Sequence, residues 1–253
     1  MPGAVQSIER AAAVLRLLSG GTGRLGCVEV ANSLGLAKGT AHGILRTLHD
    51  VGFVDQDPAT GKYGLGPGLL QLRASHLDVN MLRSIALNWS DALSARAGST
   101  VRLGVLDAGA VLVAHHGFRP DDSAQVLEVG ARRPAHACAM GKVLLAHDAA
   151  ATAALRGSPL AAYTRRTSTS WRELTAQLAE SRRLGWAGEA GELEAWTAGI
   201  AAPVRYPGGL TVAAIGISGP IDELCDVHGV PRPALVGLVQ DAARAISREL
   251  ASG

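Results

Sequence analysis

The sequence predicts an α+β protein with two domains, a small helical domain followed by a larger mixed one. The length of 253 residues suits a small domain joined to a medium-sized one. Hydrophobic residues make up 47% of the chain and charged residues 18%, which is typical of a folded protein with a core. Apolar spacing is mainly helical as far as residue 97, and strand-like segments alternate with helices after it.

The first 66 residues are expected to form three helices and a β-hairpin. Apolar residues at helical offsets in residues 7–19 predict the first helix, with Ser7 as its N-cap. A second helix covers residues 28–34 and stops at Gly35, and a third covers residues 37–50. Two short strands then flank a turn rich in Asp, Pro and Gly at residues 57–61, which predicts the hairpin.

The Gly66-Pro67-Gly68 run marks a boundary. We therefore predict a first domain over residues 4–66, a helical linker over 67–80 and a second domain over 81–253. Helices are expected over residues 69–77, 81–97, 138–156, 170–184 and 232–250, and strands over 100–106, 111–116, 125–129, 199–204 and 211–218. The helix of residues 69–77 and parts of 81–97 are expected to form a dimer seam.

Residues 28–48 have the pattern of a helix-turn-helix, because a tight turn at residues 34–36 separates two short helices. The second helix opens with small or polar residues that suit a DNA major groove, and the hairpin supplies a wing. The candidate DNA contacts are Lys38, Gly39, Thr40, His42, Arg46 and, on the wing, Lys62.

Charge by itself does not decide between DNA binding and a protein-interaction module with a polar surface. The net charge of the chain is +2, and residues 1–66 contain six basic and five acidic side chains. DNA binding needs only a local basic patch, so this balance does not exclude it. The order of helix, helix-turn-helix and wing favours DNA binding.

Several short motifs, in order, resemble the IclR family of bacterial transcription regulators. In the first domain these are residues 7–11 (SIERA), 34–42 (LGLAKGTAH), 52–54 (GFV) and 63–66 (YGLG). In the second they are residues 130–146 (GARRPAHACAMGKVLLA), 200–204 (IAAPV) and 217–220 (ISGP). Within the family, residues 38–48 and 118–130 resemble the regulators of glycerol operons in actinomycetes.

The resemblance implies a winged helix-turn-helix joined by a helix to a GAF-like effector-binding domain. It also implies a cytoplasmic homodimer or homotetramer that binds palindromic operator DNA and, in the usual case, represses transcription. The glycerol branch implies glycerol 3-phosphate as the small-molecule effector. A regulator of another catabolic operon that senses a different small organic acid remains an alternative.

The effector site is expected where residues 135–146 run from a loop into a helix. Free amides at Ala139, Met140 and Gly141 would favour an anion there. The resemblance adds Glu189, Gly199 and Ser218, although many relatives have Asp, Cys and a second Ser where this chain has Glu189, Gly199 and Gly216. Together with Trp196, these differences suggest a pocket of altered shape and lower polarity.

No other pattern indicates catalysis, a metal site or a membrane segment. The three cysteines lie far apart without a C-x-x-C pair, and a zinc site or disulfide scaffold is not expected. In the adjacent pair His115-His116 we expect one exposed and one packed side chain. The pair Arg132-Arg133 is expected at the surface or in a subunit contact. A small-molecule enzyme would need a nucleophile and a base, and we find neither.

Overall fold

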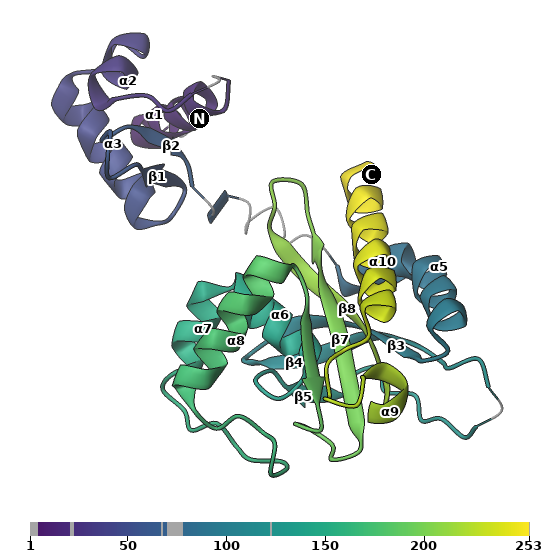
Figure 1. Ribbon diagram of the computed structural model, residues 1–253. Coiled ribbons are helices and arrows are strands. Elements are labelled where there is room, and N and C mark those ends of the chain that lie inside the picture. The colour runs from purple at the N-terminus through teal and green to yellow at the C-terminus, as the bar shows by residue number, and fades with distance from the viewer. Residues whose placement is uncertain (1–4, 21–22, 67, 70–77, 122, 253) are drawn as a thin grey trace. The chain divides into compact units, whose positions relative to one another are not determined.

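The computed structural model describes residues 5–20, 23–66, 68–69, 78–121 and 123–252 (Figure 1). The chain divides into two compact units, residues 1–76 and 77–253. The linker helix predicted at residues 69–77 falls almost entirely on residues outside the described ranges. No helix within those ranges is long and apolar enough to cross a membrane.

The N-terminal unit contains three helices and a two-stranded antiparallel hairpin. Its elements are α1 (Gln6–Gly20), α2 (Cys27–Ser33), α3 (Lys38–Asp50), β1 (Val54–Gln56) and β2 (Tyr63–Leu65). The apolar stripes of the three helices meet in one small core with both strands, formed by Val14, Leu18, Val30, Leu45, Leu48, Val54 and Tyr63. The predicted helices and hairpin are therefore present, with ends that shift by one or two residues.

Two turns set the shape of this unit. Gly35 has a φ of 63°, a left-handed conformation that ends α2 and lets α3 start after only a few residues. In the hairpin turn, the carboxylate of Asp57 accepts hydrogen bonds from the amides of Ala59 and Thr60 at 2.8 and 3.2 Å. The helix-turn-helix and the wing thus follow from local turn chemistry.

The C-terminal unit is built on a six-stranded, fully antiparallel sheet in the order β5-β4-β3-β8-β7-β6. The strands are β3 (Thr100–Asp107), β4 (Ala110–Gly117), β5 (Arg132–Pro134), β6 (Ala187–Ala190), β7 (Thr197–Arg205) and β8 (Thr211–Pro220). The helices are α5 (Val79–Ala97), α6 (Ala139–His147), α7 (Ala149–Leu155), α8 (Trp171–Leu184), α9 (Ile221–Leu224) and α10 (Pro233–Ser252).

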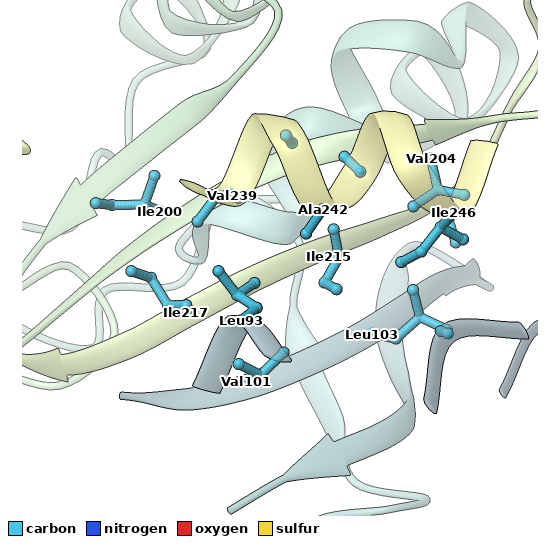
Figure 2. Packing of buried hydrophobic residues seen from close by; sticks show 14 of the residues in the cluster. Leu93, Val101, Leu103, Ile200, Val204, Ile215, Ile217, Val239, Ala242 and Ile246 are labelled. Carbon is cyan, nitrogen blue, oxygen red and sulfur yellow. The ribbon is translucent and has the colours of Figure 1, made fainter. Parts of the chain in front are cut away.

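Helices cover both faces of this sheet. On one face α5 and α10 pack over a core that includes Leu103, Ile200, Ile215, Val239 and Ile246 (Figure 2). On the other face α6 packs on the sheet and α7 and α8 pack beside it, over a second core. Strands that are covered on both faces bury almost every side chain, and β7 is buried from its second residue to its eighth.

Three sequence predictions for this unit were wrong. Residues 125–129 form no strand, because β5 takes the place beside β4. The single helix expected over residues 138–156 is broken at Asp148, whose carboxylate accepts from the amide of Ala151 at 2.8 Å and so starts α7. His115 and His116 face opposite sides as expected, yet both are buried, because both faces of the sheet are covered.

Gly141 allows α6 to lie close to the preceding loop. A Cβ atom at this position would stand 2.2 Å from the carbonyl oxygen of Ala135, which is backbone and cannot move aside cheaply. Gly237 in α10 is also helical, but a Cβ there would meet nothing within 4 Å. Position 141 therefore has no space for a side chain, whereas position 237 does.

We expect Gly141→Ala to destabilise the C-terminal unit by about 1–3 kcal/mol through overpacking. Gly237→Ala should leave stability unchanged or raise it by about 0.5–1 kcal/mol, because alanine favours the helix. Urea denaturation of both variants, followed by circular dichroism, measures the difference. Equal stability of the two variants would contradict the close approach of α6 to Ala135.

Candidate functional site

The first candidate site is the exposed face of α3 in the N-terminal unit. Lys38, Gly39, His42 and Arg46 are exposed on this helix, and Thr40 is half-buried. A Cβ at Gly39 would meet nothing within 4 Å, so the backbone is open at that point. The opposite face of α3 buries Ala41, Leu45 and Leu48, which leaves the polar face free of any packing role.

The first turn of α3 offers additional hydrogen-bond donors. Its N-cap residue Ala37 provides no side-chain cap, so the first amides of the helix remain available to an anion such as a DNA phosphate. On the wing, Lys62 is exposed, and its Nζ lies 3.8 Å from Oε2 of Glu29. Exposed pairs of this kind are weak, and a DNA phosphate can replace the carboxylate.

The second candidate site is a cavity of about 420 Å³ in the C-terminal unit. It lies between the N-terminus of α6, the strands β3, β7 and β8, and the connections on either side. Of the six residues predicted for an effector, five line this cavity: Ala139, Met140, Glu189, Gly199 and Ser218. Gly141 does not line it and instead serves the packing of α6 described above.

Strand pairing explains why these residues meet. Glu189 of β6 pairs with Gly199 of β7, which pairs with Ser218 of β8, which in turn pairs with Thr100 of β3. A Cβ at Gly199 would lie 3.3 Å from Oε1 of Glu189 and 3.4 Å from the Cβ of Ala139. Gly199 thus makes room for the longer acidic side chain, so the two departures from the common family pattern fit together.

Two partly buried arginines that line the cavity were not predicted from the sequence. Arg102 of β3 and Arg133 of β5 both bind the carboxylate of Glu128, with closest nitrogen–oxygen distances of 2.6 Å each. Arg102 also donates a hydrogen bond to the hydroxyl of Ser218. The side chains of Arg102 and Arg133 are only 12% and 19% exposed. Arg133 therefore lines the pocket and does not have the surface position that was one of our two expectations for it.

The pocket is consequently more polar than the sequence suggested. Its lining includes a third arginine, Arg119, and two further carboxylic acids, Glu189 and Glu194. Trp196, which we expected to reduce polarity, lies at 85% exposure on the rim. The sequence offered no clear signal for Arg102, because a strand position between buried Val101 and Leu103 points to the opposite face, and only the tertiary structure shows that this face is covered too.

Burial controls the protonation of the remaining groups. Desolvation raises the pKa of Glu189 to about 7, although its Oε2 accepts a hydrogen bond from the amide of Glu192 at 2.9 Å. Burial raises the pKa of the Cys138 thiol to about 11, so this thiol is protonated at neutral pH and a poor nucleophile. Lys142 and Glu192, which do not line the pocket, form a buried ion pair.

Hydrogen bonds outweigh burial at Glu128. Desolvation by itself raises the pKa of this carboxyl, but the hydrogen bonds from Arg102 and Arg133 hold it below its usual value. Glu128 is therefore ionised at neutral pH. Arg102 and Arg133 line the cavity, where a ligand anion can replace their carboxylate partners, which are Glu128 and, at 3.5 Å from Arg133, Glu194. Within the described residues, no group of three His, Cys, Asp or Glu side chains is placed to hold a metal ion.

Comparisons with known proteins identify both parts of the chain. Residues 7–58 match the IclR helix-turn-helix domain, and residues 74–248 match the bacterial transcriptional regulator IclR C-terminal domain. The glycerol operon regulatory proteins of Streptomyces coelicolor and Streptomyces griseus are each 49% identical to this chain over 98% of both sequences.

Solved structures are similar over almost the whole length. The IclR transcriptional regulator of Alicyclobacillus acidocaldarius is 29% identical, with a TM-score of 0.60 over 98% of this chain and 100% of that chain. An IclR homologue from Microbacterium hydrocarbonoxydans, solved with 4-hydroxybenzoate, is 25% identical, with a TM-score of 0.62 over 98% and 100% of the two chains. Because the family's two domain models together match most of the chain and two relatives are 49% identical over nearly their full length, the chain belongs to the IclR family of bacterial DNA-binding transcription regulators.

Proposed function

We propose that this regulator represses a glycerol catabolic operon in the cytoplasm and responds to glycerol 3-phosphate. The observation that carries the proposal is the pair Arg102 and Arg133 in the pocket of a chain 49% identical to two glycerol operon regulatory proteins. Paired guanidinium groups suit the oxygens of a phosphate. The relatives are regulators, and Cys138 is a protonated thiol, which supports binding and not catalysis as the role of the pocket.

The pocket offers complementary groups for both ends of such a ligand. We assign the phosphate to the arginine side, where Ser218 also contributes a hydroxyl. The glycerol hydroxyls are assigned to Glu189 and the amides at the start of α6, near Ala139 and Met140. A carboxyl group with a pKa near 7 can both donate and accept a hydrogen bond, which matches an alcohol.

Operator binding is assigned to the exposed face of α3, with Lys38, Gly39, Thr40, His42 and Arg46, and to Lys62 on the wing. A homodimer or homotetramer would present two such helices to a palindromic operator. The effector then changes the operator affinity by binding the two functional states unequally.

The first experiment is fluorescence anisotropy on DNA from upstream of the regulator's own gene and of any adjacent glycerol-uptake operon, with random DNA as control. Glycerol 3-phosphate should weaken specific binding about tenfold or more, which corresponds to a coupling free energy of about 1.4 kcal/mol. Glycerol, which lacks the phosphate, should have no effect. If specific DNA binding is unaffected by glycerol 3-phosphate but changes with a small oxo-acid, the proposed effector is wrong. The role as a DNA-binding regulator would still hold.

Removing Arg46 should weaken binding to the cognate operator by about 1–3 kcal/mol if its guanidinium reads a base edge. The matched control is Arg16→Ala, which removes the same charge from the exposed side of α1. Anisotropy on cognate and random DNA distinguishes reading of a base edge from contact with the DNA backbone. Equal losses on both DNAs would show that Arg46 only contacts the backbone.

Glu189→Gln should raise the free energy of unfolding of the C-terminal unit relative to the parent as the pH rises from about 4.5 to about 7. A folded-state pKa above the unfolded value stabilises the fold at low pH, and this contribution is lost as the pH rises through that window. The difference should reach about 3 kcal/mol above pH 7. Urea titrations at several pH values measure it, and Glu180→Gln, an exposed position with a lowered pKa, should show no such gain.

A further inference from the structure

Glu128 occupies the place where a ligand anion would bind. Its Oε1 accepts from Arg102 at 2.6 Å, and its Oε2 accepts from Arg133 at 2.6 and 3.1 Å. These are the nitrogen atoms that a phosphate in this pocket would use. The Glu128 carboxylate is therefore an anion of the protein itself, bound to the same two arginines that we assign to the ligand phosphate.

The hydrogen bonds around Glu128 favour ligands that carry two negative charges and more than two acceptor oxygens. Glu128 binds both guanidinium groups, Arg133 has only a longer second contact with the exposed Glu194 at 3.5 Å, and the buried Nε of Arg102 has no hydrogen-bond partner among the described residues. A monocarboxylate that replaced Glu128 would restore the same charge balance without a gain. A phosphomonoester brings nearly two charges at neutral pH and three acceptor oxygens, so it can compete with Glu128.

Apart from the Glu128 side chain, the segment that carries it is held mainly by bonds to neighbouring loop residues. Gln125 bonds to the backbone of Arg119 at 2.7 and 2.9 Å, and the carbonyl of Glu128 accepts from the amide of Ala131 at 2.9 Å. In residues 123–129, Val126 and Leu127 are 78% and 61% exposed, so they bury little apolar surface. The amide of Glu128 donates to Nδ1 of His116 at 3.3 Å, which is a long bond. The ion pairs of the Glu128 side chain are thus the strongest contact that ties this stretch to the sheet.

We propose that Glu128 acts as an internal competitor that restricts the pocket to dianionic phosphomonoesters. The ligand phosphate replaces the Glu128 carboxylate on Arg102 and Arg133, and residues 123–129 lose their attachment to the sheet. This inference rests on the proposed function in that it places the effector in the same pocket. It adds that Glu128 determines which ligand charge the pocket accepts.

The test is calorimetric titration of the full chain with inorganic phosphate, glycerol 3-phosphate and glycerate. In Glu128→Gln, a neutral side chain of the same size, both phosphate ligands should bind about tenfold tighter or more, and glycerate should bind measurably. The parent should discriminate against glycerate. The matched control is Asp107→Asn, which removes the carboxylate from the exposed Arg132 pair outside the pocket and should leave all three affinities unchanged.

A second measurement uses the parent protein, so it does not depend on a variant that folds. Hydrogen exchange of peptides covering residues 123–129 should become faster when inorganic phosphate binds, while peptides covering β5 stay protected. Unchanged affinities in Glu128→Gln, weaker binding in that variant, or unchanged exchange in the parent would each overturn the inference.

The two proposals fail in different ways. If Glu128→Gln tightens phosphate binding but glycerol 3-phosphate does not change operator affinity, the role of Glu128 is supported. The proposed effector is then wrong. If glycerol 3-phosphate releases the operator while Glu128→Gln binds it no tighter, the effector stands and the competitor is excluded. If no phosphate species binds either protein, both are overturned.

Discussion

The double coverage of the central sheet is the constraint on which the C-terminal unit depends. Because α5 and α10 lie on one face and α6 lies on the other, nearly every strand side chain must be apolar, small or paired. The candidate effector pocket lies where this sheet meets the N-terminus of α6. There the small residues Gly199 and Ala139 leave space for the side chain of Glu189.

Charges that lie inside this covered region must satisfy one another. Glu128 stands between two arginines, and Lys142 is paired with Glu192. A buried charge that loses its partner is costly, whereas a paired charge can exchange one partner for another of the same sign. This difference lets a pocket be ordered without a ligand and still have the chemistry to bind one.

The N-terminal unit works under a simpler constraint. Among the described residues, its main core cluster joins seven buried side chains from three helices and a hairpin, and the buried face of α3 is turned away from the candidate DNA contacts. The packing that stabilises the unit and the proposed DNA contacts therefore lie on different sides of α3. Substitutions on the exposed side can change the operator that is read without disturbing the fold.

The sequence by itself determined the elements whose signals are local. Helical periodicity and the Gly35 turn predicted α2 and α3, the Asp57 turn predicted the wing, and the motif at residues 135–146 predicted where the pocket lies. Only the tertiary structure decided which distant charges meet there. Arg102 contacts Glu128 across 26 positions and Ser218 across 116, and no local pattern records such pairings. For the same reason the burial of both His115 and His116 was missed, since it depends on helices that cover both faces of the sheet.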